Sequence, residues 1–298
     1  MGGADLRAHR RERKLAQFFT PVPVVRLAWD LLEWLGAKVD GARIVDPACG
    51  DGVWLTEALA RGRADMLAGW DLDERWPDSW EQSGLTADKR CHMQVGNGLL
   101  ERATDGGFDI AVGNPPFGIN LADAPARELT AVAATHHLYL GPRAPRVPPL
   151  EPSAEDLARL RRFPLELVFL ERFVSLCKPG GWLAIVLPEG VAANACWRYV
   201  RAWLAACSAM HVVIALPRGT FRPHGTSAAT CLMIMRKGPP PPGHEVTLAT
   251  LTDAGEPACE ELLAGIIGDQ DLVVVGLPDG LLPPPLQRHR LERSPASP

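Results

Sequence analysis

The chain has 298 residues, of which 31 are Lys or Arg and 35 are Asp or Glu, so its formal net charge is −4. This balance excludes a broadly basic protein that binds nucleic acid by charge alone. With 47% hydrophobic residues, the chain can bury the core of one substantial α/β domain and a small appendage. It contains no run of about 20 apolar residues, the length that a membrane-spanning helix requires.

The seven cysteines are scattered without a Cys-x-x-Cys pair, so we expect neither a disulfide framework nor a zinc site. His136 and His137 are adjacent and lack further metal ligands at useful spacing, so we predict no metal site at all. No leading apolar segment resembles a signal peptide. Together these features predict a cytoplasmic protein with no membrane partner.

The first predicted strand leads into a glycine-rich turn and a helix. Residues 42–45 are the strand, residues 46–52 (DPACGDG) are the turn, and residues 53–60 have the apolar spacing of a helix. Gly50 and Gly52 let the backbone approach a ligand at the carboxyl end of the strand. Open α/β sheets bind cofactors at this position.

The next two predicted strands also end in polar residues. Residues 66–70 end in Asp71, which lies about 20 residues beyond the glycines, where a carboxylate can bind both ribose hydroxyls of a nucleoside. A helix cap is the alternative role for this aspartate. Residues 91–95 lead into residues 96–100 (GNGLL), which include Asn97.

A fourth predicted strand, residues 108–112, ends in the sequence GNPPFG at residues 113–118. The prolines fix φ and remove two backbone donors, so the turn offers acceptors around one small site. The side-chain oxygen of Asn114 and the carbonyl of Pro115 could accept both hydrogens of an amine, while Phe117 stacks on an attached ring. An ordinary proline turn is the alternative.

The second half of the chain begins with a proline-rich stretch, residues 119–163, in which we predict a long loop with short helical pieces. A helix, a glycine turn and a central strand follow over residues 165–188. Residues 238–243 (GPPPPG) are a stiff linker. Beyond it, a strand, a helix and a strand are predicted at residues 245–251, 257–267 and 272–275, before a disordered tail from Pro283.

These motifs, in this order, resemble the amino methyltransferases that use S-adenosylmethionine, and more narrowly the adenine-N6 DNA methyltransferases of the gamma order. The sequence QFFTP at residues 17–21 resembles their N-terminal cofactor motif, and its place before DPACGDG defines that order. Residues 194–237 resemble the closing half of the modification subunits of type I restriction systems. The likeness covers roughly residues 10–237.

The resemblance implies a Rossmann-like α/β fold of the class I S-adenosylmethionine-dependent methyltransferases, with a mixed, mostly parallel seven-stranded sheet. We therefore divide the chain into an N-terminal helical segment with the cofactor motif (residues 1–40), a catalytic domain (41–237), the linker (238–243), and a small C-terminal appendage with its tail (244–298).

The resemblance also assigns the site residues. Asn97 departs from the Asp often found where these enzymes accept a hydrogen bond from the cofactor's adenine amine, which puts cofactor affinity in doubt. The implied catalytic residues are Asn114, Pro115, Pro116 and Phe117, and the implied base-stacking residues are Phe117 and Phe221. A core aromatic at the start of a strand is the alternative role for Phe221. The implied S-adenosylmethionine-binding residues are Phe19, Thr20, Pro21, Asp46, Ala48, Gly50, Gly52, Asp71, Asn97 and Asn114.

The implied substrate is an adenine flipped out of double-stranded DNA. The net charge is negative, but basic residues cluster around the proposed base pocket, which favours DNA contact, and solvated faces are the alternative. The clusters are Arg10, Arg11, Arg13 and Lys14, then Arg143, Arg146, Arg159, Arg161 and Arg162, and finally Arg218 and Arg222. Roughly 50 residues follow the linker, which is small for a surface that reads bases in a groove, so we expect either a separate specificity subunit or a homodimer. Two alternatives stay open: a methyltransferase that acts on RNA or a protein glutamine, and a non-catalytic subunit that binds DNA or partner proteins.

Overall fold

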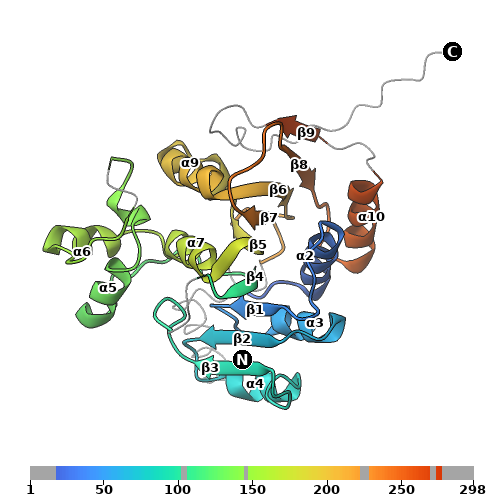
Figure 1. Cartoon of the computed structure of the whole chain (residues 1–298), viewed down its shortest axis with the longest axis horizontal. Helices are drawn as coiled ribbons and strands as arrows, with labels where there is room; N and C mark the ends of the chain where they lie inside the picture. The colour runs from blue at the N-terminus through green and yellow to red at the C-terminus, as the bar shows by residue number, and fades with distance from the viewer. Residues whose placement is uncertain (1–17, 102–105, 144–146, 222–227, 269–272, 277–298) are drawn as a thin grey trace.

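The computed structural model describes residues 18–101, 106–143, 147–221, 228–268 and 273–276. The basic cluster at residues 10–14, Gln17 and the predicted tail from Pro283 lie outside the described residues. Within these ranges, one sheet of nine strands has the order β3-β2-β1-β4-β5-β7-β6-β8-β9 (Figure 1). The strands are β1 (Arg43–Asp46), β2 (Met66–Asp71), β3 (Cys91–Val95), β4 (Phe108–Gly113), β5 (Cys177–Pro188), β6 (Ser208–Ala215), β7 (Thr230–Lys237), β8 (Glu245–Thr250) and β9 (Val273–Gly276).

The sheet is mixed and mostly parallel, which confirms the predicted fold class. Strands β3, β2, β1, β4 and β5 pair in parallel, and β7 runs antiparallel to both β5 and β6. The sheet has two strands more than the seven expected. The strand–helix–strand segment after the linker supplies them, because β8 pairs in parallel with β6 and β9 pairs antiparallel with β8.

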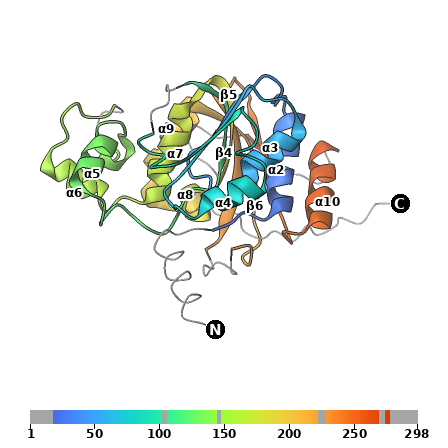
Figure 2. The same cartoon turned by 90° about the horizontal axis from the view of Figure 1, so that it is seen from below.

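Helices cover both faces of the sheet, as Figure 2 shows. The alternation along β5 sets the two faces: Trp182, Ala184 and Val186 pack in one core cluster, and Leu183 and Ile185 pack in the other. The first cluster contains α2 (Val22–Trp34), α3 (Val53–Arg61) and α10 (Glu256–Ile267), and the second contains α5 (Ala126–Ala133), α7 (Leu165–Leu176) and α9 (Arg198–Cys207). The remaining described helices are α4 (Trp76–Gln82), α6 (Ala154–Leu160), α8 (Glu189–Ala193), and the 3-10 turns η1 (Leu138–Leu140) and η2 (Ala195–Trp197).

The predicted loop between β4 and α7 contains the short helical pieces α5, η1 and α6. Both views show α5 and α6 standing out from the body of the molecule beside α7 (Figures 1 and 2). The pairing of Val45 with Ala68 of β2 and with Ala111 of β4 aligns the carboxyl ends of these three strands. The polar turns that follow the strands therefore meet at one edge of the sheet.

Replacement of Trp29 in α2 should destabilise the fold strongly. Its side chain is fully buried, and its Nε1 donates to the Trp54 carbonyl at 3.1 Å. We expect Trp29→Ala to lower the free energy of unfolding by about 3–5 kcal/mol, as for other buried aromatic residues, in urea titrations. Trp34 lies on the same helix with 45% of its surface exposed, so Trp34→Ala should change that energy by less than about 0.5 kcal/mol. Equal losses of unfolding free energy in the two variants would show that burial of Trp29 in this core does not cause its effect.

Candidate active site

A cavity of about 540 Å³ lies at the carboxyl ends of the parallel strands. This volume is typical of small-molecule sites. The N-terminal segment, the turns after β1 to β4, the stretch that leads into α5, and α7 all contribute to the wall. The lining residues are Phe18, Phe19, Thr20, Pro47, Ala48, Cys49, Gly50, Asp51, Val53, Trp54, Asp71, Leu72, Asn97, Gly98, Leu99, Asn114, Pro116, Ile119, Asn120, Leu121, Asp123, Ala124, Glu128, Leu165 and Phe169.

The turns after β1 and β2 are joined by a hydrogen bond. The Gly50 amide donates to Asp71 Oδ2 at 2.9 Å, and the Gly50 carbonyl accepts from Trp80 Nε1 at 2.8 Å. Gly50 has φ of +51°, a left-handed conformation that glycine adopts without strain. The structure thus brings the predicted residues Gly50 and Asp71 together, with both facing the cavity.

Asp71 is held by backbone amides on both of its oxygens, since Oδ1 also accepts from the Asp73 amide at 2.9 Å. Burial raises the pKa of this carboxyl above its ordinary value, although the two amide hydrogen bonds oppose the shift. Each oxygen keeps a lone pair that can accept from a ligand hydroxyl. The next residue, Leu72, lines the cavity with 57% of its surface exposed, which offers an apolar face to a ring.

The turn after β3 packs tightly against the turn after β1. A Cβ on Gly98 would lie 1.8 Å from the Pro47 carbonyl oxygen, so only glycine fits. In the same turn, Asn97 Oδ1 accepts from the Leu99 amide at 3.1 Å. Asn97 Nδ2 donates to Glu128 Oε2 at 3.3 Å. The amide oxygen that was expected to face a cofactor thus already accepts one hydrogen bond within its own turn, and it carries no charge.

Asn114, at the end of β4, presents an unused acceptor. Its Nδ2 donates to the Phe18 carbonyl at 2.6 Å, which fixes the orientation of the amide. Its Oδ1 is buried and finds no hydrogen-bond partner among the residues that the structure describes. Because a buried acceptor without a partner costs about 1–3 kcal/mol, this oxygen is suited to a donor on a ligand. Asn114 and Pro116 line the cavity, whereas Pro115 is buried beside them.

The predicted stacking residues Phe117 and Phe221 are buried, at 3% and 1% exposure, and neither lines the cavity. Phe18 stacks on Phe117 with ring centroids 4.4 Å apart and an interplanar angle of 29°. Phe221 meets Phe117 edge to face at 5.9 Å. The ring of Phe18 thus covers one face of Phe117, where a substrate base was expected to stack.

Three further predicted residues lie next to the cavity without lining it. Pro21 caps the start of α2, and Gly52, with φ of +86°, begins α3 where a Cβ would lie 2.5 Å from Leu85 Cδ1. Asp46 is 1% exposed; its Oδ1 accepts from the Ala48 amide at 3.0 Å, and its Oδ2 has no partner among the described residues. The positions of Pro21 and Gly52 indicate a role in holding the turns.

The sequence interpretation assigned no role to several residues of the cavity. The apolar wall formed by Leu165 and Phe169 of α7, and the carboxylate of Glu128, come from the irregular second half of the chain. Leu72 could have been found from its place directly after Asp71. Glu128 had no such signal, because only folding brings α5 to the turn after β3. Within the described residues, no three His, Cys, Asp or Glu side chains could hold a metal ion, and no helix there is long and apolar enough to cross a membrane.

A family model described as N-6 DNA Methylase matches residues 85–256, more than half of the chain. Two curated relatives match this chain over only part of their own length. Defense against restriction protein B of Escherichia phage P1 is 22% identical over 76% of this chain and 8% of that protein. The rRNA N6-adenosine-methyltransferase of Caenorhabditis elegans is 30% identical over 35% of this chain and 50% of that enzyme. The chain thus spans half or less of the length of these relatives.

Solved structures share the fold at low identity. The methyltransferase subunit of a type I restriction-modification system from Streptococcus thermophilus has a TM-score of 0.59 and 21% identity, over 85% of this chain and 54% of that one. A structure from Listeria monocytogenes assigned to the class I S-adenosylmethionine-dependent methyltransferases has a TM-score of 0.59 and 20% identity, over 83% of this chain and 70% of that one. The chain therefore has the class I methyltransferase fold.

The buried Asp46 should make stability depend on pH. Burial raises the pKa of this carboxyl well above its ordinary value, and the nearby carboxylates of Asp71 and Asp51 raise it further, against the Ala48 amide. A raised pKa in the folded state means that stability is fully present below the unfolded value, about 4, and is lost as the pH rises through the folded value. Asp46→Asn removes this loss of stability, because asparagine does not ionise. It keeps a side-chain oxygen that accepts from the Ala48 amide.

We therefore expect Asp46→Asn to unfold at higher urea concentration than the unmodified chain at pH 8, and the advantage to shrink as the pH falls toward 4. Replacing the unpartnered charge should raise the free energy of unfolding at pH 8 by about 1–3 kcal/mol. Asp65, exposed ahead of β2, gives the matched control Asp65→Asn. If Asp46→Asn were more stable than the unmodified chain by the same amount at every pH, ionisation of Asp46 would not be the cause.

Proposed function

The chain belongs to the N-6 DNA methylase family, and from this premise we propose that it transfers a methyl group from S-adenosylmethionine to the N6 amine of an adenine flipped out of double-stranded DNA. One observation carries the proposal: at the wall of the cavity, the buried Oδ1 of Asn114 has no hydrogen-bond partner among the described residues. A primary amine is the donor that this acceptor lacks, and the adenine N6 group is such an amine.

The residues of the cavity fit S-adenosylmethionine. Asp71 can accept from two ribose hydroxyls, Leu72 and Phe169 offer apolar faces to the adenine, and the buried Thr20 hydroxyl has no partner among the described residues. The lining includes four carboxylates, those of Asp51, Asp71, Asp123 and Glu128, and no Lys, Arg or His among the described residues, which suits a cofactor with a sulfonium and an ammonium group. When bound there, the cofactor supplies an electrophilic methyl group.

Asn114 and Pro115 hold the amine. The Asn114 Oδ1 and the Pro115 carbonyl accept its two hydrogens, so that its lone pair is directed away from them and toward the cavity. The hydrogen bond from Asn114 Nδ2 to the Phe18 carbonyl keeps the oxygen in place before substrate arrives, so little reorganisation is needed. No strong base is required, because the reaction depends mainly on positioning.

Phe117 and Phe221 remain our proposed contacts for the flipped base. For the base to stack on Phe117, the ring of Phe18 must leave the face that it now covers at 4.4 Å. The three rings of Phe18, Phe117 and Phe221 thus contact one another in the free chain. The ring of the flipped base then stacks on Phe117 in place of the ring of Phe18.

DNA is preferred over other substrates because the family match, which covers more than half of the chain, is to a DNA methylase. RNA is the second candidate, since the 30% identical nematode relative is an rRNA methyltransferase. A protein glutamine substrate and a non-catalytic role have less support, because Asn114 keeps its free acceptor beside an open cavity.

We further propose a specificity subunit as partner. Modification subunits of type I restriction systems share this fold, and one solved structure of the fold concerns complex assembly in such a system. Two of the arginines that sequence analysis placed near DNA have structural partners: Arg159 pairs with Glu155 at 2.6 Å, and Arg161 donates to the Ala122 carbonyl. A homodimer is the alternative source of a DNA-reading surface.

Asn114→Ala should abolish methyl transfer and spare cofactor binding. We expect labelled methyl transfer to unmethylated duplex DNA of mixed sequence to fall at least about 100-fold, because one preorganised acceptor at the reacting amine is removed. The dissociation constant for S-adenosylmethionine, measured by calorimetry, should change by less than about threefold, which is under 1 kcal/mol.

The control is Gln82→Ala, which removes an exposed amide on α4, away from the cavity. Nucleoside analysis should place the label in N6-methyladenine, and parallel reactions with RNA and with protein test the alternatives. Label found in RNA and not in DNA would show that RNA is the substrate. Loss of cofactor binding in step with transfer would contradict the role given to Asn114.

A further inference from the structure

We propose that Glu128, in the first turn of α5, is the acceptor for the adenine amine of the cofactor, in the role that Asn97 would otherwise fill. The inference rests on the proposed function, because it concerns the same cofactor. Sequence reasoning placed the adenine beside Asn97, and the structure puts the Glu128 carboxylate next to that residue, at the wall of the cavity.

Asn97 is poorly suited to this role. Its Oδ1 already accepts from the Leu99 amide at 3.1 Å, and an amide oxygen carries no charge. Its Nδ2, which a ligand amine cannot use, donates instead to Glu128 Oε2 at 3.3 Å. This contact orients the Glu128 carboxylate, which is half-buried. No described residue donates a hydrogen bond to its Oε1, so this oxygen can accept from a ligand. A charged acceptor forms hydrogen bonds roughly twice as strong as a neutral one.

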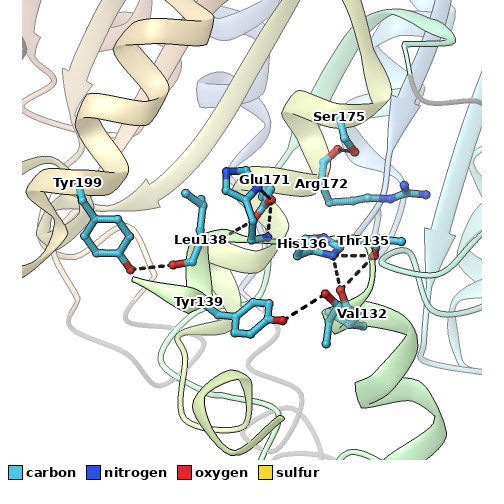
Figure 3. Close-up of polar contacts among 11 residues, drawn as sticks. Val132, Thr135, His136, Leu138, Tyr139, Glu171, Arg172, Ser175 and Tyr199 are labelled. Carbon is cyan, nitrogen blue, oxygen red and sulfur yellow. Dashed lines mark hydrogen bonds and ion pairs between the residues drawn. The ribbon is translucent and has the colours of Figure 1, made fainter. Parts of the chain in front are cut away.

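Buried side chains of α7 hold the segment that carries Glu128. The Glu171 carboxylate accepts from the consecutive backbone amides of His137 and Leu138, at 2.8 and 3.0 Å, and it also pairs with His137 Nδ1. Figure 3 shows Glu171 at the centre of these contacts, with the end of α5 beside it. The Tyr139 hydroxyl donates to the Ala133 carbonyl at 3.2 Å, so the turn after α5 is tied back to the helix.

The next residue of α7 holds the other side of the contact. Arg172 Nε donates to the Gly98 carbonyl at 3.0 Å, and its Nη2 donates to the Glu101 carbonyl at 2.7 Å. Both Glu171 and Arg172 are buried, at 6% and 7% exposure. Two neighbouring residues of one helix therefore position the segment of Glu128 and the turn of Asn97 relative to each other.

Glu128 lies in the first turn of α5, and its carboxylate is the group that the pocket presents beside Asn97. An ionised carboxylate only accepts hydrogen bonds. It therefore attracts the amine of adenine and repels the carbonyl that replaces this amine in hypoxanthine. Glu128 thus gives the pocket selectivity for an adenosyl over an inosyl ligand.

The test compares the binding of S-adenosylhomocysteine and its deaminated analogue S-inosylhomocysteine by calorimetry. We expect the unmodified chain to prefer the adenosyl ligand. Glu128→Ala should weaken adenosyl binding about 10- to 100-fold, the value of a hydrogen bond to a charged group, and should leave inosyl binding unchanged or stronger. In Glu128→Gln, whose amide can also donate, the two ligands should bind within about threefold of each other.

Asp123→Ala is the matched control, because it removes another carboxylate of the same wall. It should keep the ratio of adenosyl to inosyl affinity. Equal weakening of both ligands in Glu128→Ala, or an unchanged ratio in both Glu128 variants, would overturn the inference and leave the proposed function intact. Failure of the unmodified chain to bind either ligand would instead overturn the proposed function. Thermal unfolding of each variant identifies a loss that comes from misfolding.

Discussion

The parallel pairing of β1 between β2 and β4 is the constraint on which the rest of the site depends. It aligns three carboxyl ends, so that the turns after them must pack on one another with almost no space between. Gly98 touches the Pro47 carbonyl, and Gly113, with φ of +153°, leaves room for the Asp46 carboxylate, which a Cβ there would approach to 2.5 Å. The glycines at these turns are consequences of that close packing.

The same packing explains why polar groups are left incompletely satisfied. Asp46 Oδ2, Thr20 Oγ1 and Asn114 Oδ1 are buried at or near one edge of the sheet without partners among the described residues. Such groups cost stability in the free chain. Their concentration around a cavity is the pattern of a binding site, where ligand atoms supply what the fold leaves out.

The segment between β4 and α7 shapes the remainder of the cavity. Leu165 and Phe169 face the cavity from α7, and two and three residues beyond Phe169, Glu171 and Arg172 hold the neighbouring segments. One helix thus contributes an apolar part of the wall and also the polar contacts that hold the segment after α5 and the turn after β3. The fold places this helix on the face of the sheet opposite α2 and α3, so the cavity has lining residues from α7 on one side and from the start of α3 on the other.

The sequence by itself determined the order of strands and turns along the chain and the glycine and proline positions, and seven of the ten residues that it assigned to a cofactor line the cavity. Those features depend on the apolar pattern and on residues close together in the chain, as in the turn of Gly50 and the strand end at Asp71. The C-terminal strands β8 and β9 were recognised as strands, but their place in the sheet depends on the pairing of β8 with β6 and of β9 with β8.

Only the tertiary structure decided the contacts between distant residues. Asn97 and Glu128 are 31 residues apart, and Phe18 and Asn114 are 96 apart. No local pattern encodes such pairs, because they form only when separate elements pack against the same strands. For the same reason, the resemblance in sequence implied that Phe117 and Phe221 stack on a substrate base, whereas the fold decided that Phe18 covers Phe117 in the free chain.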